Sequence, residues 1–364
     1  MTAAMKNIRT IIFCLLAVAS VSCQHAFTEA DEPNNPVNVF DYLWNKVDQQ
    51  YAFFDVKDVD WDAVYEEYRP KVYDEMSDDS LFRVCAAILN TLQDGHTNLI
   101  APFDISLPDS LTCQMTTESQ FDGELVLLNY LTLNGHITGS FRHNAIRNGD
   151  VAYILYSSFS STISAADMLY IVDRYKDCKG MIFDMRQNSG GNDSNIEMLL
   201  SIFDNHGQVI QYNQMKAGPK HDEFSEPRPV YAADSSMLGK DFYAKPVAVL
   251  IDRGSFSATS YFAIATMAYD NIKLFGDYTG GGLGMPNGGA LPNGWTYRFS
   301  VTRTLDANGE HPEWENGVPP DVRVLLDPAM TAQGIDNIIE TAADWIMEYF
   351  DNGACRQNGN QGDD

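Results

Sequence analysis

The sequence of 364 residues has few basic side chains: 24 lysines and arginines stand against 50 aspartates and glutamates, a formal charge of −26. This deficit argues against nucleic acid as a partner and against anchoring by anionic lipid headgroups, because both need a basic surface. After the N-terminus, no apolar run is long enough to cross a bilayer. A hydrophobic content of 45% with 12% aromatic residues indicates a folded globular protein with a sizeable core.

Residue patterns that hold metals or nucleotides are also missing. Cys85, Cys113, Cys178 and Cys355 are widely spaced and form no Cys-x-x-Cys pair, so neither a zinc site nor any other metal or cofactor is expected. Export would make one or two disulfides possible, but the sequence cannot pair them. The glycine-rich run 279–284 lacks the lysine and the hydroxyl of a phosphate-binding loop, so nucleotide binding is not expected.

The N-terminus has the pattern of an export signal. Lys6 and Arg9 precede an apolar run, Ile11 to Val21, which is too short to span a bilayer. Small residues then lead to Cys23, and the whole resembles a bacterial lipoprotein signal in which Cys23 becomes the lipidated first residue. We expect a signal peptide over 1–22 and a lipidated tether over 23–36, which would be the chain's one membrane contact. The expected address is the cell envelope, at the outer membrane, on its periplasmic or surface face. Cleavage without lipidation is the alternative.

Helical spacing of apolar residues dominates residues 37–102 and predicts an N-terminal helical subdomain. Its last helix, Leu81 to Leu92, ends in the turn Gln93–Thr97, which presents His96. A neutral imidazole is the side chain best suited to take a proton from a serine near pH 7. By itself, His96 could equally be a surface residue of a helix-ending turn.

Strand patterns follow. Residues 103–150 are predicted as a small β-rich connecting segment, with Leu125–Leu128 as its clearest strand. From Val151 on, short apolar strands alternate with helices, which predicts an α/β fold with a mainly parallel sheet over 151–350. The last helix is expected from Ala332 to Phe350, followed by a flexible polar tail over 351–364.

Two turns after buried strands carry the candidate chemistry. Gly190 and Gly191 follow a strand that ends at Asp184, and adjacent glycines let backbone N–H groups approach a substrate closely, as an oxyanion hole requires. Ser257 follows a strand that ends at Ile251 and precedes a helix, whose free N–H groups and dipole favour developing negative charge. The alternative is that the hydroxyl residues of this turn only cap the helix.

Six motifs in this order resemble the S41 serine peptidases, a family that includes the C-terminal processing proteases, the tricorn core and the interphotoreceptor retinoid-binding repeats. The motifs are Asp94–Thr97, Asp184–Gly191, Ser257–Ser260, Gly276–Gly280, Leu291–Gly294 and Gly317–Asp321. The aromatic motifs before residue 62 also resemble exported members of Bacteroidetes type. The resemblance implies a crotonase-like (ClpP/crotonase) core over 151–350. A full PDZ domain is not expected, since only about fifty residues separate His96 from Val151.

The resemblance also implies roles for residues of the second turn. Ser257 matches the nucleophile of the family. Its own N–H group or that of Ala258, together with those of Gly190 and Gly191, would form the oxyanion hole.

The sequence differs from one branch of the family at the residue that activates the serine, and this difference implies which residue acts as the base. The lysine that activates serine in the C-terminal processing members is replaced by Gly282. The tricorn-like branch instead uses a histidine, which His96 matches, and a glutamate that orients the imidazole. Glu315 is the preferred match for this glutamate and Glu313 is the alternative.

The implied function is hydrolysis of a peptide or protein substrate by acyl-enzyme chemistry, with a Ser-His-Glu rather than a Ser-Lys site. One alternative is a catalytically inactive protein of the S41 fold that binds peptides or apolar ligands. A crotonase-type acyl-coenzyme A enzyme is disfavoured, because export removes access to coenzyme A and the acidic chain suits its phosphates poorly. The oligomeric state is not indicated.

Overall fold

The computed structural model describes residues 33–108, 119–133, 135–203, 207–232 and 243–359. The predicted signal peptide, Cys23 and most of the predicted tether lie outside the described residues, as does Cys113. Within the described ranges, no helix combines the length and the apolar character that crossing a bilayer requires. Cys85 and Cys178 are buried free thiols.

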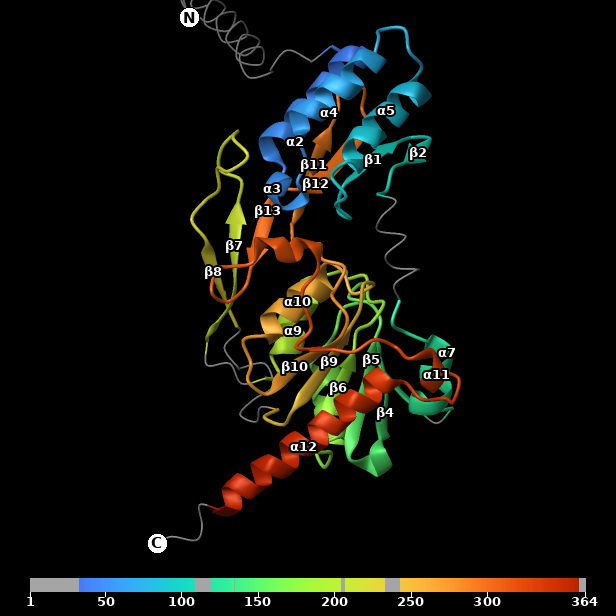
Figure 1. Ribbon diagram of the computed structural model, residues 1–364, viewed down its shortest axis with the longest axis vertical. Coiled ribbons are helices and arrows are strands. Elements are labelled where there is room, and N and C mark those ends of the chain that lie inside the picture. Colours follow the sequence, from blue (N-terminus) through green and yellow to red (C-terminus); the bar gives the residue numbers. More distant parts are fainter. Residues whose placement is uncertain (1–32, 109–118, 134, 204–206, 233–242, 360–364) are drawn as a thin grey trace, which may run out of the picture.

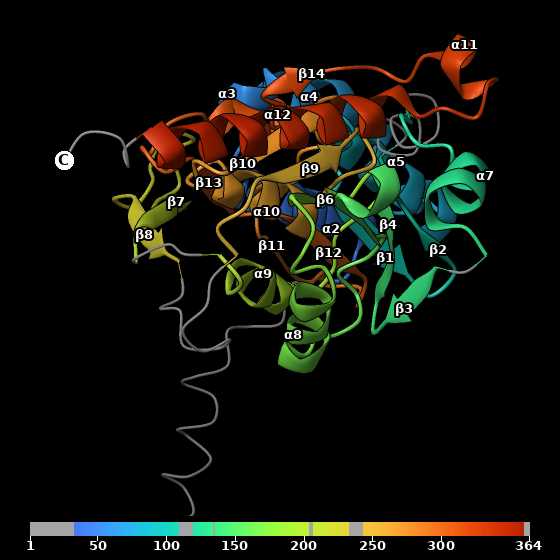
Figure 2. The ribbon, with the colours of Figure 1, turned by 90° about the horizontal axis from the view of Figure 1, so that it is seen from below.

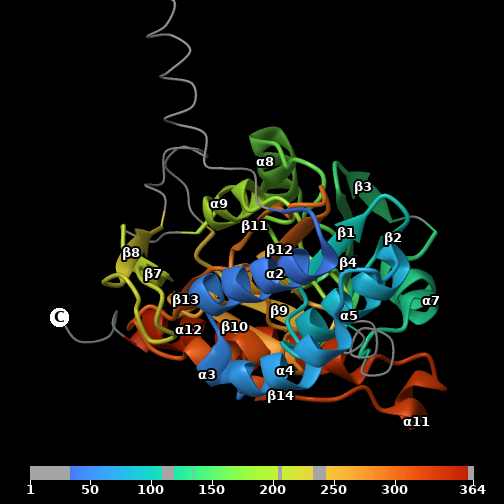
Figure 3. The same ribbon diagram turned by 90° about the horizontal axis from the view of Figure 1, so that it is seen from above.

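The described chain begins with a group of helices, which lie at one end of the molecule in Figure 1 and face the viewer in Figure 3. They are α2 (Pro36–Gln50), α3 (Phe54–Lys57), α4 (Trp61–Tyr68), the short η1 (Arg69–Lys71) and α5 (Asp78–Asn90). The side chains of Asn35, Asp60 and Ser77 accept hydrogen bonds from first-turn N–H groups of α2, α4 and α5. The apolar faces of these helices meet in one core, so the predicted helical start of the fold is present.

A four-stranded sheet ties this helical group to the C-terminal half of the chain (Figure 1). Its strands, in spatial order, are β11 (Pro286–Ala290), β12 (Thr296–Ser300), β1 (Asn98–Ala101) and β2 (Asp104–Ile105). β1 runs antiparallel to β12 with Asn98 opposite Arg298. Aromatic residues of the β12 segment, such as Trp295 and Phe299, complete the core of the helices. The N-terminal unit is therefore built from two stretches of the chain that are far apart in sequence.

The second half contains a seven-stranded sheet. Its strands, in spatial order, are β14 (Val322–Arg323), β10 (Ile272–Gly276), β9 (Val247–Ile251), β6 (Gly180–Asp184), β5 (Val151–Tyr156), β4 (Phe141–Ile146) and β3 (His136–Thr138). The strands from β14 to β5 pair in parallel. β4 pairs antiparallel with β5, and β3 pairs antiparallel with β4. The predicted α/β fold with a mainly parallel sheet is confirmed.

Helices cover both faces of this sheet (Figure 2). One face packs against α12 (Asn337–Gly359), and the other against α8 (Ala165–Arg174), α9 (Ser194–Leu200) and α10 (Ala258–Thr266). Successive residues of β5 alternate between the two cores, with Ala152 on the side of α10 and Tyr153 on the side of α12. Burial on both sides explains why these strands appear in the sequence as unbroken apolar runs.

A smaller sheet and several short helices complete the described fold. The sheet has the order β13 (Thr302–Leu305), β7 (Val209–Met215) and β8 (Arg228–Tyr231). The short helices are α7 (Gly123–Leu125), η2 (Val126–Leu131), η3 (Arg147–Gly149), η4 (Pro312–Asn316) and α11 (Pro328–Thr331).

The predicted strand Leu125–Leu128 is wrong, because this run lies in α7 and the π-helical η2. The carboxylate of Asp122 accepts hydrogen bonds from the N–H groups of Glu124 and Leu125 and so starts the helix. Leu125, Val126, Tyr130 and Leu131 are buried, whereas Leu127 and Leu128 are exposed. That spacing suits a helix, but four consecutive apolar residues do not reveal it.

The last helix begins and ends later than predicted, at Asn337 and Gly359 instead of Ala332 and Phe350. Gly334 adopts a φ of +79°, which interrupts the helix. The Asp336 carboxylate then caps the new start by accepting the N–H groups of Ile338 and Ile339. The helix also continues past Phe350 and through Gly353, so the glycine that follows the predicted boundary does not end it.

Candidate active site

Ser257 stands at the junction of β9 and α10, in a strained backbone conformation. Its φ is 55° and its ψ −119°, a region that costs a residue with a side chain about 1–3 kcal/mol. The side chain makes no capping hydrogen bond to the helix. The turn before it is held by Ser255, which donates to the Met185 carbonyl and accepts the Asp252 N–H group. The Ser257 hydroxyl is therefore not used to cap its own helix.

His96 is held from three sides in the turn that precedes β1. Its backbone N–H group donates to Asp94 Oδ1 at 2.8 Å, and its carbonyl accepts Nε of Arg298 at 3.1 Å. The ring contacts that of Phe256 in a tilted arrangement, with centroids 4.9 Å apart. Because Arg298 lies in β12, the β1–β12 pairing itself positions the imidazole.

The two side chains meet: Nε2 of His96 lies 3.0 Å from Oγ of Ser257, across 161 residues of sequence. The connection between them can be followed along the chain. The N–H group of Ser257 donates to the Gly281 carbonyl at 3.0 Å, and Phe256 forms an isolated bridge with Gly281. The loop then continues into β11 and β12, and β12 pairs with β1 next to His96. The sheet thus brings the histidine to the serine.

Burial lowers the pKa of His96 below its usual 6.5, and the positive charge of Arg298 lowers it further. The negative charge of Asp94 and the Gly284 backbone act in the opposite direction and only partly offset this. The imidazole is therefore neutral at pH 7, the form that can accept a proton.

Glu315 is buried close to this pair but contacts a loop, not the imidazole. Its Oε2 accepts the N–H groups of Leu283 at 2.5 Å and Gly284 at 3.1 Å, and Nζ of Lys57 lies 3.9 Å from Oε1. Nδ1 of His96 is buried and has no hydrogen-bond partner among the described residues. Burial, reinforced by the charge of Asp94, raises the pKa of Glu315 to about 8.

The alternative acid, Glu313, lies on the surface. Its carboxylate contacts Nδ1 of His311 at 2.7 Å, and its side chain is 59% exposed. The hydrogen bond to His311 lowers the pKa of Glu313. Of the two glutamates, the structure places Glu315 in the buried cluster with Asp94 and Lys57.

The predicted oxyanion-hole residues fall into two groups. The N–H groups of Gly191 and Ala258 have no hydrogen-bond partner in the part of the chain that the structure describes. The N–H group of Gly190 instead donates to Oδ1 of Asn188 at 3.0 Å, and that of Ser257 is bonded to Gly281. Gly190 is therefore not a donor to substrate in this structure.

Gly190 has a steric role. A Cβ atom at this position would lie 2.6 Å from the Phe256 carbonyl oxygen and 2.9 Å from both the Ala258 nitrogen and the Ser257 Cβ. Only a glycine lets the two turns approach this closely.

Gly282, which replaces the lysine of other S41 members, is likewise constrained by its neighbours. A Cβ there would lie 2.5 Å from the ring of Phe256, and the residue has a φ of +76°. Phe256 is the residue whose ring contacts that of His96. The aromatic ring thus occupies the space that a side chain at position 282 would need.

Several residues of the site were not assigned a role from the sequence. Asp94 lies two residues before His96 and accepts its N–H group, a turn pattern that could have been recognised. The Tyr51 hydroxyl and Oδ2 of Asp94 are both buried and have no hydrogen-bond partner among the residues that the structure describes. Lys57 and Arg298 are contributed by α3 and β12, and no local pattern announces that they reach the site.

Comparisons with known proteins agree with this architecture. The model of peptidase family S41 matches residues 150–324, and that of the tricorn protease C1 domain matches residues 34–90. A candidate peptidase from Parabacteroides merdae, known from its crystal structure, is 36% identical, with a TM-score of 0.80 over 86% of this chain and 97% of that one. The chain belongs to peptidase family S41.

More distant relatives cover less or share only the fold. The carboxy-terminal processing protease CtpA of Bacillus subtilis is 27% identical over 188 residues, which are 50% of this chain and 37% of that protein. The chain thus spans 37% and 34% of the lengths of the two curated relatives that it matches. Mature CPAF in complex with lactacystin has a TM-score of 0.63 over 87% of this chain and 99% of its own, at 11% identity.

Proposed function

We propose that this chain is an exported serine-type peptidase that hydrolyses peptide bonds through an acyl-enzyme, with Ser257 as nucleophile and His96 as general base. The observation that carries the proposal is the 3.0 Å contact between Nε2 of His96 and Oγ of Ser257. Family membership supports a serine protease as the general class. The signal-like N-terminus and Cys23 support export and a lipid-anchored address in the cell envelope.

In the first half of the proposed reaction, Oγ of Ser257 attacks the carbonyl carbon of the scissile peptide bond while Nε2 of His96 takes the hydroxyl proton. The carbonyl oxygen becomes an oxyanion, which the free N–H groups of Gly191 and Ala258 stabilise. Nε2 then returns the proton to the leaving amine as the C–N bond breaks. The acyl group stays on Ser257 as an ester.

In the second half, water attacks the ester carbonyl and His96 takes a proton from it. Collapse of the intermediate breaks the bond to Oγ, and the serine regains its proton from the imidazole. Because its lowered pKa keeps the His96 ring neutral, the ring can accept a proton at the start of each half of the reaction.

Glu315 acts in this proposal through the loop that it anchors. Its carboxyl oxygen fixes the N–H groups of Leu283 and Gly284, and the Gly284 backbone in turn favours the protonated His96 ring. Asp94 contributes a buried negative charge close to the imidazole and holds the His96 N–H group. Both acids are positioning residues.

The alternative of a non-catalytic binding protein is not favoured. A separation of more than about 8 Å between the histidine and the serine would have supported it, because such groups cannot exchange a proton directly. The observed 3.0 Å is a hydrogen-bonding distance.

Labelling by a fluorophosphonate probe tests the proposal on the purified protein. The wild type should form a covalent adduct at Ser257, and Ser257→Ala should abolish it. His96→Ala should slow labelling by at least about 10²-fold, as expected for loss of a general base. Ser80→Ala in α5 serves as the matched control and should label normally. An adduct that persists in Ser257→Ala at another serine would refute the assignment.

A further inference from the structure

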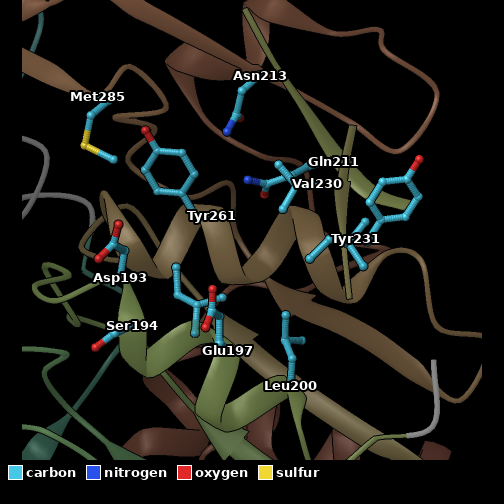
Figure 4. A pocket seen from close by; sticks show the side chains of 12 residues that line it. Asp193, Ser194, Glu197, Leu200, Gln211, Asn213, Val230, Tyr231, Tyr261 and Met285 are labelled. Carbon is cyan, nitrogen blue, oxygen red and sulfur yellow. The ribbon is translucent and has the colours of Figure 1, made fainter. Parts of the chain in front are cut away.

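A cavity of about 310 Å³ lies between α9, α10 and the β7–β8 pair (Figure 4). Three of its lining residues are close in sequence to residues of the candidate site. Tyr261 lies one helical turn after Ser257 and donates its N–H group to the Ser257 carbonyl at 3.0 Å. Asp193 follows Gly191 by two residues, and Met285 follows the Gly284 loop that Glu315 anchors. The volume is at the lower end of the range for ligand pockets.

Among the described residues, the charges that line this cavity are all negative. Asp193 and Glu197 are its charged residues, and they lie one helical turn apart at the start of α9 (Figure 4). Neither carboxylate has an ion pair or a hydrogen bond with any described residue. Two free carboxylates on one wall attract a cation and repel an acidic side chain.

The remaining wall combines apolar side chains with one buried hydroxyl. Ile196, Leu200 and Val230 contribute aliphatic surface. The hydroxyl of Tyr261, a residue only 9% exposed, has no hydrogen-bond partner among the described residues. Figure 4 shows this hydroxyl pointing between Met285 and Asn213. Since buried hydroxyls are normally hydrogen-bonded, a ligand group is the natural partner.

We propose that this cavity receives the substrate side chain on the acyl side of the scissile bond, and that it selects lysine or arginine. The apolar wall accommodates the methylene stem of such a side chain, while Asp193 and Glu197 bind its charged end. The Tyr261 hydroxyl accepts a hydrogen bond from it.

The position of the cavity assigns it to that substrate residue. The inference rests on the proposed function, in which Gly191 and Ala258 hold the oxygen of the attacked carbonyl. Asp193 and Tyr261 line the cavity and follow these two residues by two and three positions, so the cavity is assigned to the side chain on the α-carbon next to that carbonyl. The overall charge of −26 also draws basic segments toward the protein.

Hydrolysis of matched peptides tests the selection. Pairs of internally quenched peptides would differ at one position, arginine against citrulline and lysine against norleucine. We expect the wild type to prefer the charged member by about tenfold in kcat/KM, the effect of two partly exposed ion pairs. Asp193→Asn/Glu197→Gln should remove the preference, as should high salt. Glu348→Gln, an exposed acid in α12, should retain it.

Binding to the Ser257→Ala variant separates this inference from the proposed function. Fluorescence anisotropy with the same peptides needs no catalysis. The arginine peptide should bind about tenfold more tightly than its citrulline partner, and Tyr261→Phe should weaken its binding by about tenfold, the lower value for a hydrogen bond to a charged group. Charge-selective binding without any hydrolysis by the wild type would overturn the peptidase but support the cavity. Hydrolysis or binding without charge preference, or no binding at all, would overturn the cavity's role.

Discussion

Replacing Glu315 by glutamine should flatten the dependence of stability on pH. Burial raises the pKa of this carboxyl to about 8, whereas the unfolded chain has the ordinary value of 4.5. Between these values the folded protein binds more protons than the unfolded one, so the free energy of unfolding falls as pH rises. For one group, the loss between pH 6 and pH 9 amounts to about 3 kcal/mol. The Glu315→Gln variant cannot ionise at this position, so it should show none of this loss of unfolding free energy.

Urea unfolding followed by tryptophan fluorescence at pH 6, 7, 8 and 9 measures this effect. Glu348→Gln is the matched control. That carboxylate is exposed on α12 and lies outside the buried cluster of Glu315, Asp94 and Lys57, so the slope of the wild type should persist. Parallel curves for the wild type and Glu315→Gln would refute the reasoning, since they would mean that Glu315 is already ionised in the folded protein.

The same variant distinguishes two roles for Glu315 in catalysis. Glutamine keeps an acceptor oxygen for the N–H groups of Leu283 and Gly284, so kcat/KM should fall by less than about tenfold if the residue only anchors the loop. In a triad whose acid bonds directly to the histidine, the exchange of acid for amide costs about 10⁴ in kcat. Glu315→Ala should lose more activity than the glutamine variant, because it leaves both N–H groups without a partner. A loss of 10³ or more in Glu315→Gln, with stability intact, would show direct orientation of the ring.

Three further predictions concern the base, the glycine turn and the buried arginine. The acid limb of kcat/KM against pH should report an apparent pKa below 6.5, because burial favours neutral His96; a value above 6.5 would contradict this. Gly190→Ala should lower kcat by about 10² or more through displacement of the nucleophile turn. Gly294→Ala, at a similar positive φ with open space around it, should leave kcat unchanged. Arg186→Met should destabilise the fold by about 3–5 kcal/mol in urea unfolding, because two buried carboxylates lose their partner. Arg83→Met, which breaks an exposed ion pair, should cost less than about 1 kcal/mol.

Local patterns in the sequence predicted the elements whose environment is simple. The β9 run Val247–Ile251 is buried on both faces and therefore apolar at every position, which is visible without knowledge of its neighbours. The Leu125–Leu128 run was also apolar at every position but proved helical, since its start is decided by the capping carboxylate of Asp122. Short apolar runs do not distinguish these cases. Side chains next to the run, such as the Asp122 carboxylate, decide between strand and helix.

The candidate site likewise has features that the sequence predicted and features that it could not predict. The order of motifs identified Ser257 and His96, and the structure places these two side chains at hydrogen-bonding distance. Their roles stay a prediction until labelling tests them. The sequence could not show that the N–H group of Gly190 is bonded to the Asn188 side chain, because this depends on the rotamer of one residue. Nor could it place the contacts of Glu315, which join segments about thirty residues apart.

The position of His96 depends on a pairing that no local pattern encodes. Its turn belongs to the core of the N-terminal helices, whereas Ser257 starts a helix in the core of the central sheet. The β11–β12 hairpin links the two, since its entry loop bonds to the Ser257 turn and β12 pairs with β1. A small rotation between the cores would separate the imidazole from the hydroxyl without unfolding either core. Catalytic competence in the proposed peptidase is therefore a property of this hairpin as much as of the two side chains that it brings together.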